Sequence, residues 1–140
     1  MRKLYLATAV ALTGLLLAGC SAGSASPNSI QRAIEAADTS LVLSDLAPDN
    51  VTGFLIVCPY ESADSVADRL GFTWSDAPDY STVDGRQTIA FVDHDQVASH
   101  AELSRDDVDF CGSDQWDVLP IETALTVSHT ADAIQILAPA

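Results

Sequence analysis

The strongest constraint on the fold is an unbroken apolar run in the middle of the chain, from Gly53 to Cys58. The run has the length of a β-strand, contains β-branched residues, and is ended by Pro59. A strand with one face in water alternates apolar and polar residues, whereas a continuous apolar run is typical of a strand buried on both faces or centred in a sheet. We therefore expect this segment to lie inside the core.

Two amphipathic helices are predicted, one on each side of this strand in the sequence. Residues 28–37 place apolar side chains at i, i+3, i+4 and i+7, with Asn28 or Ser29 as the N-cap. The second helix repeats this spacing after Ser62, which can cap it, and ends at Gly71, which can adopt the left-handed conformation common after helices. Each helix has one apolar stripe to bury.

Two β-hairpins are predicted in the second half of the chain, because short alternating runs flank polar turns. Residues 87–92 and 96–103 form the first hairpin, and residues 124–128 and 133–137 form the second. Both hairpins imply antiparallel pairing. On the second strand of the first hairpin, the period of two is expected to place on one face Val97, Ala101 and Leu103.

The order helix, strand, helix, hairpin, hairpin predicts one α+β domain over residues 29–140. We expect about five strands in a mainly antiparallel sheet, with the two short helices on one face. Residues 41–46 show no clear period and are expected to be irregular. Residues 104–120 are expected to form a long loop.

The N-terminal segment has the three parts of a secretory signal. Arg2 and Lys3 precede an apolar stretch over residues 4–17, and small residues then lead to Cys20. The apolar stretch is shorter than the about 20 residues that a membrane-spanning helix needs. A cleaved export signal therefore explains this segment better than a transmembrane anchor.

Residues 17–20, a leucine, an alanine, a glycine and a cysteine, resemble the lipobox of bacterial lipoproteins. The resemblance implies that residues 1–19 are a signal peptide and that Cys20, the first residue of the mature chain, carries a diacylglyceryl thioether. Residues 20–28 would then be the lipidated cysteine and a flexible tether of small and polar residues. The protein would be lipid-anchored to the cell membrane and face outside the cytoplasm. The alternative is a plain secretory signal with Cys20 as an incidental thiol.

The other two cysteines, Cys58 and Cys111, would mature outside the cytoplasm, where thiols are oxidised. We expect a disulfide between them that holds the 104–120 loop and stabilises the fold by about 4 kcal/mol in the chain-entropy model. A reactive thiol or a metal ligand is the alternative, although no histidine lies at zinc-ligand spacing from either cysteine.

A second resemblance concerns the mature domain. Its Asp-rich, lysine-free composition, the Cys-Pro-Tyr sequence after the buried strand and the distant second cysteine are similar to those of small uncharacterised lipoproteins of actinobacteria. This resemblance supports the location and implies no activity.

Acidic residues dominate the mature chain. The whole sequence has a net charge of −14, and without residues 1–19 it keeps four arginines, no lysine and all twenty acidic residues, a net charge of about −16. This charge repels phosphate backbones and anionic lipid headgroups. We therefore expect no nucleic-acid partner, and attachment to the membrane through the acyl chains on Cys20. A protein of the cell envelope is compatible with the charge.

The densest carboxylate cluster is a weak candidate for a Ca²⁺ site, because closely spaced oxygens suit a hard cation. Its spacing matches an EF-hand loop at the first, third and sixth positions. The match then fails, since Cys111 and Val118 stand where the loop needs an oxygen ligand and a bidentate glutamate. We expect no cofactor, and the cation to test is Ca²⁺. The candidate ligands are Asp106, Asp107, Asp109 and Asp114.

Catalytic motifs do not surround the three histidines, His94, His100 and His129: the sequence has no HExxH, no GxSxG and no recognisable triad. We expect surface histidines and no enzymatic activity. Trp74 and Trp116 lie in acid-rich loops, and amphipathic aromatic residues are enriched at interfaces. These two residues are the predicted binding residues.

The sequence thus favours a lipid-anchored binding or interaction module of the cell envelope. Two alternatives stay open at this point. One is an envelope hydrolase whose site has no recognisable motif, and the other is a cation-binding domain for sensing or adhesion.

Replacing Cys20 with alanine tests the lipid anchor. Cys20→Ala removes the sulfur that carries the lipid, so we expect the domain to be released or mislocalised while its melting temperature stays unchanged. Membrane fractionation and thermal unfolding of the variant measure the two effects. A Cys20→Ala protein that is anchored and processed like wild type would contradict the lipobox.

Overall fold

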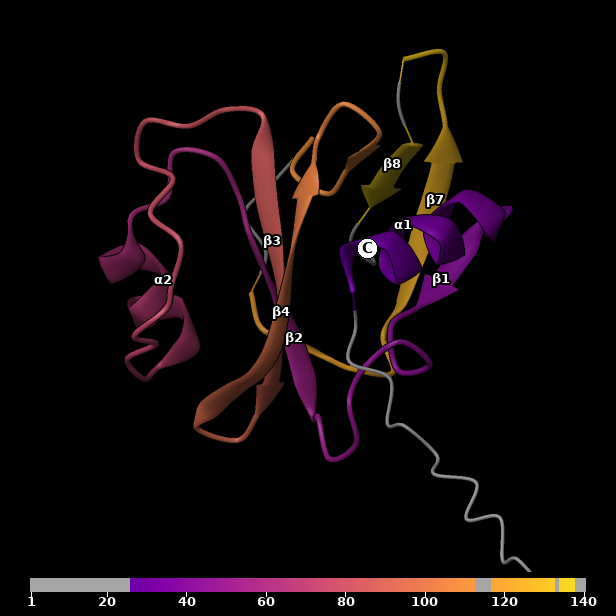
Figure 1. Cartoon of the computed structure of the whole chain (residues 1–140). Helices are drawn as coiled ribbons and strands as arrows, with labels where there is room; N and C mark the ends of the chain where they lie inside the picture. Colours follow the sequence, from indigo (N-terminus) through magenta and orange to yellow (C-terminus); the bar gives the residue numbers. More distant parts are fainter. Residues whose placement is uncertain (1–25, 113–116, 133, 138–140) are drawn as a thin grey trace, which may run out of the picture.

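The computed structural model describes residues 26–112, 117–132 and 134–137. Within these residues the chain forms two helices, α1 (Pro27–Ala36) and α2 (Ala63–Leu70), and eight strands in two four-stranded sheets (Figure 1). The predicted α+β class is confirmed. The prediction of about five strands in one sheet is wrong, because the strands divide between two sheets.

Sheet B contains the predicted central strand. Its strand order is β4-β3-β2-β6, and all neighbouring strands are antiparallel. The apolar run forms β2, in which every residue is buried, as the sequence indicates. An added Cβ at Gly53 would lie 2.8 Å from the backbone oxygen of Leu119, so this glycine permits the close approach of β6. The strands are β2 (Gly53–Val57), β3 (Arg86–Asp93), β4 (Gln96–Ser104) and β6 (Leu119–Pro120).

Sheet A has the order β1-β7-β8-β5, with β5 parallel to β8 and the other pairs antiparallel. The hairpin β7–β8 agrees with the prediction, but β1 extends into the stretch predicted to be irregular. The predicted 104–120 loop contains β5 and β6. A strand of two or three residues is too short to show an alternation of apolar and polar residues. Such strands form because their backbone pairs with a strand that is distant in the sequence. The strands are β1 (Ser40–Val42), β5 (Val108–Asp109), β7 (Ala124–His129) and β8 (Ile134–Leu137).

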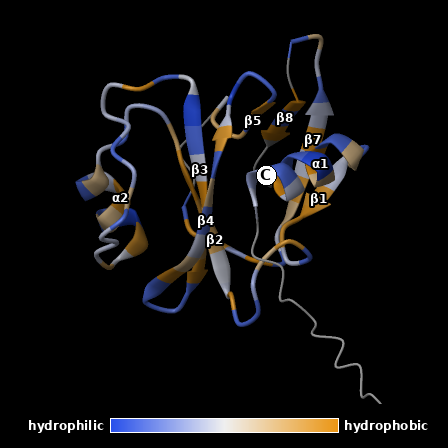
Figure 2. Cartoon of the chain, in the orientation of Figure 1, coloured by the Kyte–Doolittle hydropathy of each residue, from blue (hydrophilic) through white to orange (hydrophobic). Residues whose placement is uncertain are grey.

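The elements form layers with sheet B in the middle (Figure 1). Alternate side chains of β2 enter different clusters: Phe54 and Ile56 face sheet A and α1, whereas Leu55 packs with α2. The two helices therefore lie on opposite faces of sheet B, and the prediction of both on one face is wrong. In Figure 2 each helix has a hydrophobic and a hydrophilic side, as the spacing predicts.

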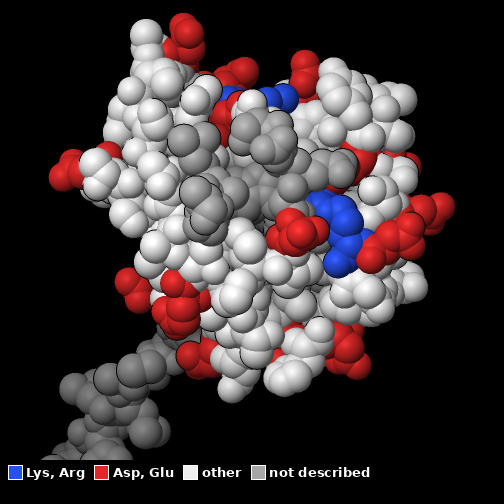
Figure 3. Space-filling view, turned by 180° about the vertical axis from the view of Figure 1, so that it is seen from behind, with Lys and Arg blue, Asp and Glu red and all other residues white. Residues whose placement is uncertain are grey.

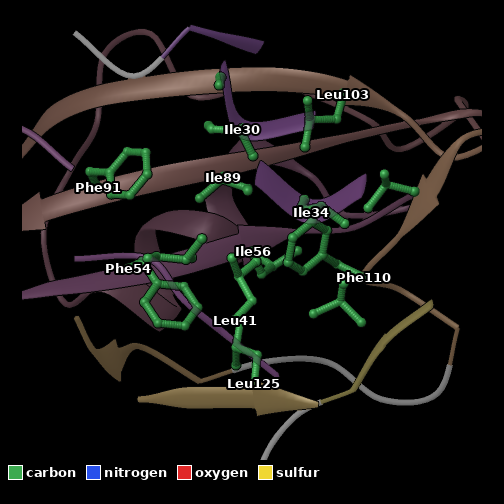
Figure 4. Packing of buried hydrophobic residues seen from close by; sticks show 14 of the residues in the cluster. Ile30, Ile34, Leu41, Phe54, Ile56, Ile89, Phe91, Leu103, Phe110 and Leu125 are labelled. Carbon is green, nitrogen blue, oxygen red and sulfur yellow. The ribbon is translucent and has the colours of Figure 1, made fainter. Parts of the chain in front are cut away.

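The main core fills the space between sheet B, sheet A and α1 (Figure 4). Helix α1 contributes Ile30 and Ile34, both fully buried, and β7 contributes Leu125 and Val127. Full burial of a large aliphatic or aromatic side chain contributes about 1.5–3 kcal/mol. The labelled members of this cluster are Ile30, Ile34, Leu41, Phe54, Ile56, Ile89, Phe91, Leu103, Phe110 and Leu125.

The helix ends follow capping rules. Ser26, rather than Asn28 or Ser29, is the N-cap of α1, and its side chain exchanges hydrogen bonds with Ser29 in a capping box. Helix α1 therefore begins inside the segment expected to be tether. Helix α2 has Ser62 as N-cap and Gly71, at φ 76°, as C-cap, and both predictions are confirmed. In the described part of the chain, neither helix is long and apolar enough to cross a membrane.

The hairpin β3–β4 contains a β-bulge that changes which side chains share a face. Phe91 pairs with Ser99 but Val92 pairs with Val97, so one extra residue lies in β4. Ala101 and Leu103 consequently face the main core, whereas Val97 packs on the α2 side. The prediction that these three residues share a face is wrong for Val97, because the bulge shifts the alternation.

The disulfide between Cys58 and Cys111 is present, with a Cα–Cα distance of 5.7 Å. It joins the end of β2 to the residues after β5, and so connects sheet B to sheet A. The sequence prediction is confirmed. Closing a loop of 53 residues lowers the entropy of the unfolded chain, a stabilisation of about 4 kcal/mol.

A buried glutamine makes a second connection between the sheets. Gln87 on β3 is fully buried, and its amide nitrogen donates to the carbonyl of Val108. Its amide oxygen accepts from the backbone N–H of Phe110 at 3.0 Å. The side chain thus bonds β5 as a neighbouring strand would, which satisfies two buried backbone groups.

Replacing Gln87 with alanine tests this connection. Gln87→Ala leaves the carbonyl of Val108 and the N–H of Phe110 buried without these partners, so we expect a loss of about 3 kcal/mol in the free energy of unfolding. Urea unfolding measures it. The control is Gln96→Ala at the exposed start of β4, which should cost less than about 0.5 kcal/mol. Equal losses in both variants would contradict the role of Gln87.

Candidate functional site

The candidate site lies at the end of sheet B where β2 ends, β3 begins and β4 ends, at the top of the sheet in Figure 1. Four segments meet there through the disulfide and through side-chain bonds. We call this region the Tyr60 corner, defined by Tyr60, Asp84, Arg105, Asp109 and the Cys58–Cys111 disulfide.

Tyr60 is the most exposed large hydrophobic side chain among the described residues, at 67%. Its backbone is left-handed, with φ 67°, and its N–H donates to the carbonyl of Tyr80 at 2.9 Å. The left-handed conformation costs a residue with a side chain about 1–2 kcal/mol. The fold therefore holds a strained backbone beneath an aromatic ring that contributes little to the core.

Buried charges fix the turn that carries Tyr60. Glu61 is only 2% exposed, and one carboxylate oxygen accepts from the N–H of Cys58 at 3.2 Å. The other oxygen accepts from Arg69 of α2 at 2.5 Å, and Arg69 also donates to the carbonyl of Ile56. Removing one member of such a buried pair leaves an unpaired charge and costs about 3–5 kcal/mol. The turn is therefore held to the end of β2 through Cys58 and Ile56, and to α2 through Arg69.

Arg105 is the cation of the Tyr60 corner. Its guanidinium donates to both carboxylate oxygens of Asp109 at 2.9 Å and to one oxygen of Asp84 at 3.1 Å. The hydrogen bonds to Asp109 are the largest cause of a raised pKa of Arg105, and smaller contributions come from Asp84 and Tyr60. The bidentate pair with Asp109 fixes the orientation of the guanidinium.

A polar network lies beside the Tyr60 corner, on the α2 side of sheet B. The hydroxyl of Tyr80 lies 2.8 Å from the Thr88 hydroxyl and donates to Glu102 at 2.9 Å. Glu102 also accepts from Arg86. Burial raises the pKa of Tyr80 to about 12, against an opposing hydrogen bond from Thr88. Tyr80 is only 4% exposed and serves packing.

A shallow hollow of about 250 Å³ lies on this network. It is open to solvent, and the ion pair between Arg86 and Glu102 forms part of its wall. The two side chains already neutralise one another, so the hollow presents no free charge of either sign from this pair. Its lining residues are Gly85, Arg86, Glu102, Leu103 and Ser104.

The surface is acidic, and three of the four described arginines are paired with carboxylates, whereas Arg32 donates to the carbonyl of Asn28. Figure 3 shows the blue arginine atoms only in small areas, each bordered by red carboxylates. Ion pairs join Arg69 to Glu61 and Arg86 to Glu102, besides the bonds of Arg105. The described surface therefore offers more free carboxylate than free guanidinium.

The structure separates the members of the predicted carboxylate cluster. Asp109 is held by Arg105, whereas Asp106 and Asp107 are exposed. Asp114 lies outside the described residues. Across residues 26–112, 117–132 and 134–137, no three His, Cys, Asp or Glu side chains come together as a metal site.

Of the two predicted binding tryptophans, only Trp74 lies within the described residues. Trp74 is half-buried, packs against the α2-side cluster and meets the ring of His100 edge-on at 5.2 Å. Its position is that of a packing residue at the margin of the sheet. Trp116, like Cys20, lies outside the described residues.

The histidines are exposed, as predicted, and each contacts one other residue described below. His94 occupies the β3–β4 turn at φ 54° and lies 2.6 Å from Asp93, which lowers the pKa of that carboxyl. His129 bonds the carbonyl of Ala37 at 2.9 Å, and His100 contacts Trp74. The three histidines come from separate places and do not share a site.

Sequence reasoning missed Tyr60 and Arg105. Tyr60 follows a proline in a turn, where an aromatic residue breaks no pattern, and nothing in one sequence indicates its left-handed backbone. Arg105 could have been noticed as one of only four arginines after residue 3. No protein-family model, curated protein or solved structure matches this chain.

The raised pKa of Tyr80 predicts a loss of stability in strong alkali. The unfolded chain releases this proton near pH 10 and the folded protein near 12, so the free energy of unfolding should fall over this window by an amount on the order of 2 kcal/mol. Urea unfolding at several pH values measures the loss. Tyr80→Phe, which has no proton to release, should show a shallower fall, and equal slopes would contradict the assignment.

Proposed function

We propose that the protein is a lipid-anchored binding module of the cell envelope that contacts a partner protein through the Tyr60 corner. The anchor is proposed from the resemblance of residues 17–20 to a lipobox. The binding role is proposed from the corner itself. In this proposal Cys20 fixes the location, and the folded domain supplies the contact.

The observation that carries the proposal is the strained and exposed Tyr60. Strained backbone persists only where the surroundings impose it, and it is concentrated at functional sites. Tyrosine is one of the residue types that contribute most binding energy at protein interfaces. The exposure of Tyr60 at 67% supports a protein contact.

Rigidity supports the same proposal. The disulfide, the Glu61–Arg69 pair and the Arg105–Asp109 fork all hold the corner, so little conformational freedom remains to be lost on binding. A rigid backbone beneath the ring loses less entropy on binding than a mobile loop does. The corner is therefore better suited to a persistent partner than a flexible loop would be.

The tether limits where the partner can be. Five residues lie between Cys20 and the N-cap Ser26, and the six steps from one to the other extend at most roughly 20 Å. A lipid on Cys20 would keep helix α1 near the membrane surface. The proposed partner is then another membrane-attached protein or one that approaches the membrane closely.

The capture of partners on intact cells tests the proposal. We expect crosslinking of the tagged, full-length protein, followed by mass spectrometry, to recover one reproducible envelope protein. Tyr60→Ala should reduce that capture at least about tenfold, because interface anchors of this type contribute about 2 kcal/mol or more. Val118→Ala is the matched control, since Val118 is the other large exposed hydrophobic residue in the described chain.

Stability distinguishes a binding role from a structural one. Tyr60→Gly should keep or raise the melting temperature, because glycine tolerates φ 67° without strain and the lost ring is mostly exposed. A Tyr60→Gly protein that is stable and still captures the partner as wild type does would contradict the proposed function.

A further inference from the structure

Strand β4 is an open edge of sheet B. The two sheets have four edge strands in the described part of the chain, and three of these, β1, β5 and β6, have only two or three residues. Strand β4 has nine residues and pairs on one side only, with β3. No backbone hydrogen bond joins its other side to a described residue. A row of backbone N–H and C=O groups therefore faces outward from β4.

The composition of β4 does little to block the addition of a strand. Proteins protect exposed edges with lysine, proline, unbalanced charges or bulges. Strand β4 contains no lysine and no proline, and its one carboxylate, Glu102, is paired with Arg86. The bulge places its extra residue at Ala98, near the start of the strand. Residues 99–103 therefore form a regular stretch of edge that is open to another strand.

This stretch is complementary to itself when a second copy runs antiparallel to it. Its middle residue is Ala101, and pairing Ala101 with Ala101 of a second copy sets His100 opposite the other copy's Glu102. His100 and Glu102 are two residues apart, so they lie on one face of the strand. Opposite residues of an antiparallel pair have Cβ atoms about 4.5–5.5 Å apart, which is within reach of contact between their side chains.

The two side chains are able to bond one another. The imidazole of His100 is exposed and has an N–H to donate in either protonation state. The side chain of Glu102 is 45% exposed even though it accepts from Arg86. These are the only ionisable side chains on β4, and the two-fold symmetry forms the contact between them twice.

We infer that two copies of this chain associate through antiparallel pairing of residues 99–103, with Ala101 on the two-fold axis and His100 of each copy beside Glu102 of the other. The two four-stranded sheets B then form one continuous sheet. The second copy is the occupant because the order of charges on β4 matches its own reverse. This association goes beyond the proposed function and does not depend on the Tyr60 corner.

The symmetry is compatible with two anchors in one membrane. A two-fold axis that joins equal strands into one continuous sheet is perpendicular to that sheet, so each layer meets its equivalent on the same face. Helix α1 packs against β4 on the face that sheet A covers. Both copies therefore enter α1, at Ser26, on one face of the dimer. With the proposed lipid on Cys20, both chains are held at one surface, which raises their effective concentration.

Sedimentation equilibrium of the full-length protein in density-matched detergent micelles measures the association over a range of concentrations. Each chain has a net charge of −14, so about 0.3 M salt is used to screen the repulsion between copies. His100→Glu places like charges opposite one another twice and should weaken the association at least about fivefold. His100→Lys keeps a donor opposite Glu102 and should associate at least as tightly as wild type.

The matched control is His94→Glu, which makes the same change of charge in the exposed turn between β3 and β4. It should leave the association near that of wild type. Thermal unfolding of each variant verifies that the domain still folds.

Hydrogen exchange of the wild-type protein provides a measurement that needs no variant. As the concentration rises, pairing should slow the exchange of the outward-facing amides within residues 99–103. The amides of β1, an edge of sheet A, should exchange at an unchanged rate. This comparison decides the inference even where His100→Glu does not fold.

Three results would each overturn the inference. The first is a wild-type protein that stays monomeric up to about 1 mM. The second is equal weakening by His100→Glu and His94→Glu, and the third is amide protection that omits residues 99–103. Tyr60→Ala should leave the association unchanged, so failure of the dimer and failure of the proposed function are measured on different variants.

Discussion

Burial of β2 on both faces is the constraint on which the rest of the fold depends. Phe54 and Ile56 need apolar cover on one side of sheet B, and Leu55 and Val57 need it on the other. One covering layer cannot serve both faces. Sheet A with α1 therefore covers one face, and α2 with the loop around Tyr80 covers the other.

The end of β2 is held by interactions of three kinds. The disulfide of Cys58 crosses to sheet A, and the carboxylate of Glu61 accepts a hydrogen bond from the backbone N–H of Cys58. Arg69 of α2 donates to Glu61 and to the carbonyl of Ile56. These bonds offset the about 1–2 kcal/mol that the left-handed Tyr60 costs.

The distribution of charge connects the fold to the proposed role. Three arginines, Arg69, Arg86 and Arg105, meet carboxylates at the end of sheet B where the Tyr60 corner lies. They serve the fold by neutralising carboxylates that packing brings close together. The acidic residues left over face solvent, where they favour solubility and attract positively charged partners.

The sequence by itself determined the elements whose signal is local. The apolar run fixed β2, helical spacing and Ser62 fixed α2, two hairpins followed from alternation, and the cysteine pair was identified correctly. Only the tertiary structure decided the division into two sheets, the short strands β1, β5 and β6, and the face of Val97, because non-local pairing and a bulge set them. The backbone conformation of Tyr60 was also decided by the tertiary structure. The carbonyl of Tyr80 accepts the N–H of Tyr60, and the carboxylate of Glu61 and the disulfide hold the neighbouring Cys58. Together they impose a left-handed backbone that a residue with a side chain disfavours.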